Sequence, residues 1–170
     1  RRRGLKRVMV EPHLSVTGAM SAEWVPIRAK TDAAFLFAVI HRIIKERNWA
    51  EVCDVRFLKE DTTSPYLVGP NGYYLREPGT EKPLIWDLAD GQAKPFDGNI
   101  TDAAMDGSFQ VTGLEIGADD EVWQQEGVVV KPAFQVLLDH MEEYTPDWAE
   151  VECDVPAETI RRIGDEFVAH

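Results

Sequence analysis

A short apolar segment followed by a much longer one most constrains how this chain can fold. Residues 6–10 (KRVMV) have the character of a strand buried on both faces, and Pro12 ends it because proline cannot donate to a ladder. After a polar stretch, Thr31 and Asp32 supply an N-cap and a first-turn acid for the run AAFLFAVIHRII at 33–44. That run is apolar nearly all round, which predicts a helix packed on more than one side. Strand, loop and buried helix in this order make half of a βαβ unit.

Short β-like runs separated by turns fill the middle of the chain. The sequence GPNG at 69–72 is a hairpin signal, and Asp-Gly pairs at 90–91, 97–98 and 106–107 indicate further turns. These pairs lack the ligand ladder and terminal Glu of a calcium loop, so plain turns are favoured. The predicted strands lie at residues 55–58, 66–68, 73–76, 84–86, 109–111 and 128–130.

Helical periodicity returns towards the end of the chain. One helix is predicted with Pro132 in its first turn, a short one from Thr145, and a last one after Pro156. The outline is therefore α/β at both ends with a β-rich insertion between them. The predicted apolar faces comprise Phe134, Leu137, Leu138 and Met141 in the first helix and Ile160, Ile163, Gly164 and Phe167 in the last.

Charge is spread unevenly along the chain, whose net charge is −12. Seven cations and two carboxylates give residues 1–30 a charge of +5, so the other 140 residues carry −17. The bulk acidity argues against nucleic-acid binding, whereas the cationic start is suited to a phosphate-bearing ligand. The alternative is that Arg1–Arg3 only finish a helix, whose C-terminal dipole favours cations. No apolar stretch reaches the roughly 18 residues of a membrane span, so no direct membrane insertion is predicted.

Cysteine and histidine spacing gives no metal motif. Cys53 and Cys153 belong to no CxxC pair, so both are predicted to be reduced and buried. The four histidines form no HxxxH or HExxH pair, and no protein-bound metal is predicted. The start RRRGLK resembles a twin-arginine signal but lacks the apolar region that must follow. The absence of an initiator Met, with a start in mid-pattern, predicts a segment of a longer polypeptide.

Two carboxylates flank the polar stretch between the predicted first strand and the predicted apolar helix. Ligands of open α/β sheets bind beyond the carboxyl ends of the strands, where Glu11 can accept hydrogen bonds from the two hydroxyls of a ribose. Asp32, oriented by its helix, can accept from the N1–H and 2-amino groups of guanine. The alternative is structural: Thr31 and Asp32 only start a helix, and Glu-Pro only ends a strand. The loop residues able to contact phosphate or sugar are His13, Ser15, Thr17 and the backbone of Gly18.

Two stretches of this sequence resemble molybdopterin oxidoreductases of the dimethyl-sulfoxide-reductase type. The first is KRVMVEPHLSVTGAMSAEWVPIRAKTDAAFLFAVIHRII at 6–44. The second lies near the end of the chain and contains YTPDWA (144–149) and DVPAETIR (154–161). The resemblance implies part of a doubly wound, Rossmann-like parallel-sheet domain. Its α/β nucleotide-binding part would be residues 1–50, its β-rich insertion 51–130, and its helical α/β return 131–170.

The resemblance also implies a cofactor and roles for five residues. Two molybdopterin guanine dinucleotides (bis-MGD) would chelate molybdenum or tungsten, and this chain would hold the nucleotide end of one of them. Asp32 would accept from guanine N1 and N2, while Glu11, His13 and Thr17 would line the ribose and diphosphate and Thr31 would orient the loop. The family's usual Pro-Gly before Thr-Asp is Ala29-Lys30 here, which implies a less tight turn and an added cation.

Within that family, the sequence looks most like the catalytic subunits of thiosulfate/polysulfide-reductase-like and phenylacetyl-CoA:acceptor oxidoreductase-like enzymes. No catalytic residue and no metal ligand is predicted in this chain, and an iron–sulfur cluster is expected outside it. The implied partners are the rest of the catalytic subunit, with separate subunits for iron–sulfur electron transfer and for membrane anchoring.

Two other interpretations stay open. A stand-alone nucleotide-binding or scaffold domain would need a GxGxxG or GxxxxGK[ST] loop, which does not occur in the sequence. An acidic interaction protein is the third possibility, and it rests on net charge alone.

Overall fold

The computed structural model describes residues 5–111 and 128–169, and the chain forms two compact units. The first unit joins residues 1–52 to residues 141–170, and the second comprises residues 53–140. Helices occur with both parallel and antiparallel strands, which confirms the α/β class. The domain boundaries expected at residues 50 and 130 stay predictions. The cationic residues 1–3 lie outside the described residues.

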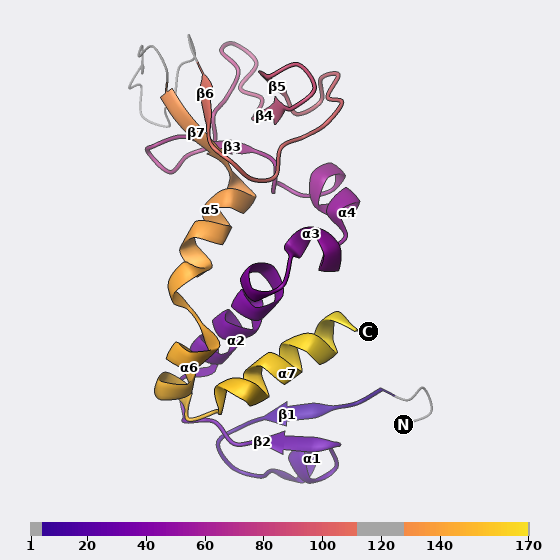
Figure 1. Ribbon diagram of the computed structural model, residues 1–170, viewed down its shortest axis with the longest axis vertical. Coiled ribbons are helices and arrows are strands. Elements are labelled where there is room, and N and C mark those ends of the chain that lie inside the picture. The colour runs from indigo at the N-terminus through magenta and orange to yellow at the C-terminus, as the bar shows by residue number, and fades with distance from the viewer. Residues whose placement is uncertain (1–4, 112–127, 170) are drawn as a thin grey trace. The chain divides into compact units, whose positions relative to one another are not determined.

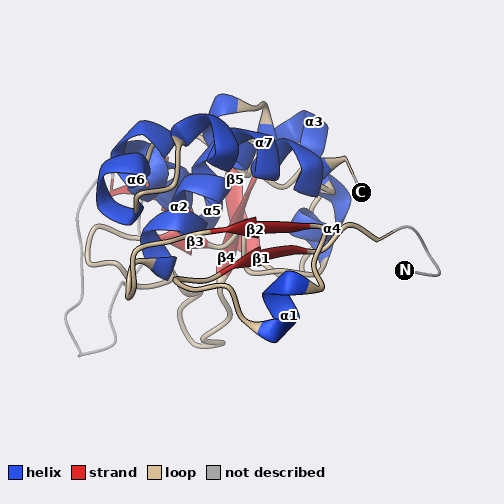
Figure 2. Cartoon of the chain, turned by 90° about the horizontal axis from the view of Figure 1, so that it is seen from below, coloured by secondary structure: helices blue, strands red, loops and turns tan. Residues whose placement is uncertain are grey.

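A parallel strand pair opens the first unit. β1 (Val8–Val10) and β2 (Glu23–Val25) pair in register, with Val8 opposite Glu23 and Val10 opposite Val25, and the one-turn helix α1 (Val16–Ala19) connects them. In both views α1 lies on one side of the pair and the long helices of this unit on the other (Figures 1 and 2). The predicted first strand is confirmed, but it is half-buried, because β2 is its only paired strand among the described residues. α1 and β2 were not predicted.

The apolar run forms the predicted helix. α2 (Asp32–His41) continues into the π-helical segment η1 (Arg42–Glu46) and is followed by α3 (Trp49–Val52). Phe35 and Ala38 are buried, and the Nδ1–H of buried His41 donates to the carbonyl of Met141 at 2.7 Å. Leu36 is 56% exposed, so the described residues do not cover this helix all round.

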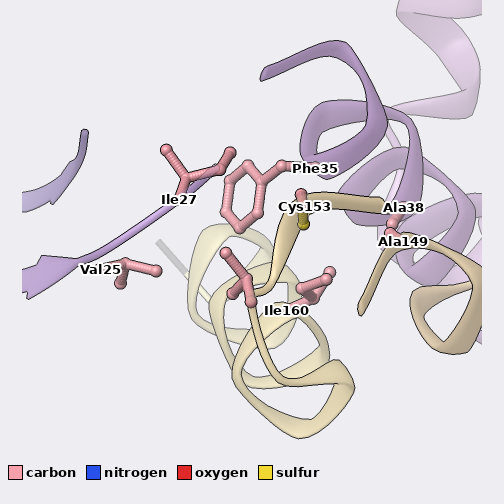
Figure 3. Packing of buried hydrophobic residues seen from close by; sticks show 8 residues of the cluster. Val25, Ile27, Phe35, Ala38, Ala149, Cys153 and Ile160 are labelled. Carbon is pink, nitrogen blue, oxygen red and sulfur yellow. The ribbon is translucent and has the colours of Figure 1, made fainter. Parts of the chain in front are cut away.

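The last residues return to the first unit as η2 (Met141–Glu143), α6 (Pro146–Cys153) and α7 (Ala157–Val168). Thr145 caps α6 as predicted, its hydroxyl accepting from the N–H of Trp148 at 3.1 Å. Phe167, predicted on the apolar face of α7, is 75% exposed. Figure 3 shows how β2, α2, α6 and α7 contribute side chains to one core, which comprises Val25, Ile27, Phe35, Ala38, Ala149, Cys153, Val155 and Ile160.

The second unit is mainly antiparallel. Its strands are β3 (Leu67–Val68), β4 (Leu84–Asp87), β5 (Gln92–Pro95), β6 (Phe109–Val111) and β7 (Val128–Pro132). The order β3-β7-β6 makes one sheet and β4-β5 a hairpin, and α5 (Ala133–His140) follows β7. The turn at 69–72 is confirmed, since the N–H of Gly69 donates to Tyr73 at 2.9 Å and Gly72 has φ +80°. The predicted strand at 73–76 is reduced to isolated bridges at Tyr74 and Arg76.

The predicted strand at residues 55–58 is wrong, because this segment is the helix α4 (Val55–Glu60). The Asp54 carboxylate caps it by accepting from the N–H of Phe57 at 3.0 Å, and Arg56 pairs with Glu60 one turn later. A short apolar run has no clear period, so local capping decides between helix and strand.

A buried carboxylate organises the loops around the β4–β5 hairpin. Asp87 is completely buried and accepts four hydrogen bonds. Its Oδ1 receives the N–H groups of Ala89 (3.1 Å) and Asp102 (2.9 Å), and its Oδ2 receives the N–H of Thr101 (3.0 Å) and the ammonium of Lys94 (2.7 Å). The Lys94 ammonium and then these N–H groups hold the pKa of Asp87 well below its ordinary value.

Stability should therefore depend on the ionised form of Asp87. Its pKa is depressed in the folded protein, so its contribution is complete above about pH 4, near the ordinary pKa of Asp, and is lost as the pH falls further. Asp87→Asn should lower the melting temperature at pH 7 by about 5 °C or more and reduce the further loss on acidification to pH 3. The control is Asp90→Asn, which removes a partly exposed partner of the same lysine. Equal melting curves for the two variants would contradict the role of Asp87.

Candidate functional site

The parallel pairing of β1 and β2 places the residues that follow both strands at the same end of the sheet, the end formed by the carboxyl ends of the strands. Glu11 directly follows β1, and residues 26–31 lead from β2 to Asp32 at the start of α2. The N–H of Glu11 donates to the carbonyl of Val25 at 3.2 Å, so the two strands stay paired to their carboxyl ends. In open α/β sheets, ligands bind beyond these carboxyl ends.

Glu11 organises the loop that follows it. Its Oε1 accepts from the N–H of Ser15 at 2.8 Å and from the Ser15 hydroxyl at 2.7 Å. The same hydroxyl accepts from the N–H of Gly18 at 3.0 Å and caps α1. The backbone hydrogen bond from Ser15, and then the one from its hydroxyl, lower the pKa of Glu11. The carboxylate is therefore held ionised and oriented, and among the described residues no donor is bound to its Oε2.

Gly18 is required by this arrangement. A Cβ at position 18 would lie 2.3 Å from Oε1 of Glu11, so any side chain there would displace the carboxylate. Trp24 supports the same loop from β2, because its indole Nε1–H donates to the carbonyl of Glu11 at 3.1 Å. Trp24 lies within the stretch at 6–44 that carries the family resemblance, but no role was predicted for it.

Arg28 ties the connection between β2 and α2 to the end of α6. Its guanidinium forms two hydrogen bonds with the Asp154 carboxylate, at 2.7 and 3.0 Å, and one with the carbonyl of Glu152 at 2.9 Å. Its backbone N–H donates to the carbonyl of Cys153, also at 2.9 Å. The Arg28–Asp154 pair is half exposed and contributes little stability by itself, but a cation at a helix C-terminus is favourable. No signal in the sequence pointed to this role of Arg28.

Thr31 and Lys30 shape the start of α2. Thr31 occupies the N-cap position as predicted, but its hydroxyl makes no cap bond; it donates instead to the carbonyl of Arg28 at 2.7 Å. Lys30 has φ +70°, in the left-handed region that glycine adopts without strain. The turn therefore has a glycine-like backbone conformation at this position although a lysine occupies it.

The other three residues that were predicted to bind the cofactor are exposed. His13 lies just before α1, Thr17 lies within it, and Asp32 is the first residue of α2. The carbonyl of Thr17 accepts from the Ser21 hydroxyl at 3.1 Å, and no hydrogen bond joins these three side chains to one another in the described part of the chain. No hydrogen bond from residues 5–111 or 128–169 reaches the exposed carboxylate of Asp32, which leaves it available for the paired donors of a guanine edge. The residues present are thus chemically suited to a guanine nucleotide.

Most of the described cations that were expected to face a phosphate are engaged elsewhere. Lys6 pairs with Glu166 at 2.7 Å and with Glu23 at 3.0 Å, and Arg7 donates to the carbonyl of Met20 at 2.7 Å. Arg28 is bound to Asp154, as described above. Of the four cations between residues 5 and 30, Lys30 is the one that makes no hydrogen bond to another described residue.

Cysteines and potential metal ligands are dispersed through residues 5–111 and 128–169. Cys153 is buried, as predicted, whereas Cys53 is half-buried, and both are free. Burial raises the pKa of both thiols. Within these ranges no three His, Cys, Asp or Glu side chains are grouped to hold a metal ion. No helix there has the length and apolarity to cross a membrane.

Comparison with known proteins relates this sequence to oxidoreductases. No protein-family model matches it. A sulfite dehydrogenase subunit of Allochromatium vinosum is 31% identical over 181 residues, which cover 98% of this chain. The alpha subunit of perchlorate reductase from Dechloromonas aromatica is 26% identical over 202 residues (96% of this chain). A selenate reductase subunit of Mesobacillus selenatarsenatis is 27% identical over 192 residues (98% of this chain).

The chain spans 17%, 20% and 16% of the lengths of these three relatives, respectively. Each match covers nearly the whole chain, so the similarity includes both units and not only the opening motif. These matches identify the chain as a relative of one segment of large oxidoreductase subunits, and they support its resemblance to the catalytic subunits of molybdopterin oxidoreductases.

Proposed function

We propose that this chain is the part of a larger molybdopterin-dependent oxidoreductase subunit that binds the guanine nucleotide end of a molybdopterin guanine dinucleotide. One observation carries the proposal: Glu11 and Asp32 each follow one of two paired parallel strands, beyond the carboxyl ends where α/β sheets bind nucleotides. The similarity to oxidoreductase subunits supports it independently.

The binding roles follow from which acceptors are still available. Asp32 accepts from N1–H and the 2-amino group of guanine, and its position in the first turn of α2 fixes its direction. Glu11 uses Oε1 to order its own loop, which leaves Oε2 for the ribose hydroxyls. His13 and Thr17 are exposed beside it for the sugar and diphosphate, and Thr31 holds the turn through the carbonyl of Arg28.

The cofactor supplies the redox chemistry. A bis-MGD group with molybdenum or tungsten exchanges two electrons with a small substrate when it is bound. The residues of this chain bind and orient its nucleotide end, and no catalytic residue is assigned to them. The names of the relatives refer to sulfite, perchlorate and selenate, which favours an oxyanion substrate over polysulfide or an acyl-CoA. An iron–sulfur cluster elsewhere in the subunit, with electron-transfer and membrane-anchor partners, completes the proposal.

Replacing the guanine acceptor tests the assignment directly. Asp32→Asn turns one acceptor oxygen into a donor that faces a guanine donor, so affinity for the dinucleotide should fall roughly 10- to 100-fold. The variant is made in the intact subunit, and its metal content and the GMP released by acid hydrolysis are measured per protein. The matched control is Glu158→Gln, which removes a first-turn carboxylate from α7.

The result expected is a loss of metal and GMP in Asp32→Asn but not in Glu158→Gln. Unchanged occupancy in Asp32→Asn would exclude its role at the base. An intact parent protein containing neither molybdenum, tungsten nor GMP would exclude the proposed function as a whole.

Lys30 gives a second test, because strain and charge can be separated there. Lys30→Gly relieves the positive φ and should raise the free energy of unfolding by up to about 1 kcal/mol in urea titrations. It also removes the cation, so cofactor occupancy should fall if this ammonium contacts the diphosphate. Glu81→Gly is the control, since Glu81 has φ +59° in the second unit. Equal occupancy in both variants would remove Lys30 from the binding site.

A further inference from the structure

Two residues of the first unit have a left-handed backbone although neither is glycine. Lys30, in the turn before α2, has φ +70°, and Asp154, which ends α6, has φ +61°. Among the described residues the third one of this kind, Glu81, lies in the second unit. Such a backbone persists only where surrounding contacts hold it, and it is concentrated at ligand-binding sites. The contacts that hold Lys30 and Asp154 therefore bear on function.

The guanidinium of Arg28 reaches Asp154 as a fork. Its Nε–H and one Nη–H donate to the two carboxylate oxygens of Asp154, at 3.0 and 2.7 Å, and its other Nη donates to the carbonyl of Glu152 at 2.9 Å. A bidentate pair of this kind fixes the orientation of both side chains. Both carboxylate oxygens of Asp154 thus accept from one cation on the loop that leads to α2.

The backbone of Arg28 carries this restraint to the turn before α2. Its N–H donates to the carbonyl of Cys153 at 2.9 Å, and Cys153 is buried in the core shown in Figure 3. Its carbonyl accepts from the Thr31 hydroxyl at 2.7 Å, and this bond closes a loop around Lys30. The residue after that loop is Asp32.

The Arg28–Asp154 pair provides position more than stability. The two side chains are 50% and 64% exposed, and ion pairs as exposed as this one contribute little to the free energy of unfolding. A guanine edge, in contrast, presents two parallel donors, which a carboxylate can meet only in one plane. Groups that bind in such a geometry must be held to within about 0.5 Å by the residues that support them.

We propose that Asp154 is a positioning residue for the cofactor: through Arg28 it holds the turn at Lys30, and the turn directs the Asp32 carboxylate at guanine. The inference rests on the proposed function, in which Asp32 accepts from the base. Asp154 acts only through Arg28, because both of its oxygens are engaged there.

Aspartate suits position 154 for two reasons. Its short polar side chain tolerates the left-handed region better than most residues do. It also supplies both acceptors of the fork. Glycine would adopt the same backbone conformation but would leave the guanidinium of Arg28 bound to carbonyls of α6 alone. Replacement by glycine therefore separates the positioning role of Asp154 from its backbone conformation.

Asp154→Gly in the intact subunit tests the inference. Affinity for the dinucleotide should fall roughly tenfold, as it does when a supporting partner is removed at metal sites, and metal and GMP per protein should fall with it. The cofactor-free subunit, produced in cells that make no molybdopterin, should melt within about 2 °C of the cofactor-free parent. The matched control is Glu81→Gly, which also removes a carboxylate at a positive φ and should keep its GMP.

A parent-like GMP content in Asp154→Gly would overturn the inference. An equal loss of GMP in Glu81→Gly, or a cofactor-free Asp154→Gly subunit that melts well below its parent, would reduce the effect to general destabilisation and would also overturn it. GMP in the parent with no loss in Asp154→Gly removes the positioning role alone, whereas a parent without GMP removes the proposed function and this inference together.

A double-mutant cycle tests the route through Arg28. Arg28→Lys keeps the cation at the end of α6 but loses the fork, so it should lower GMP content by itself. Asp154→Gly should then cause a smaller loss in the Arg28→Lys subunit than in the parent. Losses that simply add would show that Asp154 does not act through Arg28, and the inference would be wrong.

Discussion

The contact between α2 and α6 is the interaction on which the first unit depends. Ala38 and Ala149 are both completely buried, and their small side chains let the two helices approach closely. Phe35 and Ile160 fill the space beside them, and the buried His41 closes one end by donating to the carbonyl of Met141. Two segments from opposite parts of the chain thus build one core, and residues 53–140 fold as a unit within the connection between them.

This core also determines the shape of the candidate site. The loop between β2 and α2 is bound to the last turn of α6 through the backbone N–H of Arg28 and through its guanidinium. Cys153, which accepts the backbone bond, is itself a core residue. An anchored loop can hold Lys30 at a positive φ, which an unsupported loop would relax. The start of α2, and with it Asp32, is consequently positioned by residues that are distant in sequence.

The sequence predicted those features that local chemistry decides. The strand at β1, the apolar helix α2, the Thr145 cap and the turn at 69–72 follow from periodicity, capping and glycine, and the structure contains them. Prediction of secondary structure from the sequence failed where the hydrophobic pattern was short or the segment was polar. α1 and β2 lie in a stretch that lacks an apolar period, and α4 differs from a strand only through the cap that Asp54 provides.

The candidate site, too, could be predicted from the sequence only in part. Residue types made Glu11 and Asp32 candidates, but the same types also suit a plain strand end and helix start, and the resemblance of the surrounding motif assigned both residues to a nucleotide. The bonds that anchor the loop before Asp32 could not be predicted, since Arg28 meets Asp154 only when α2 packs on α6. The Asp32 carboxylate of the first unit is exposed and matches the proposed nucleotide.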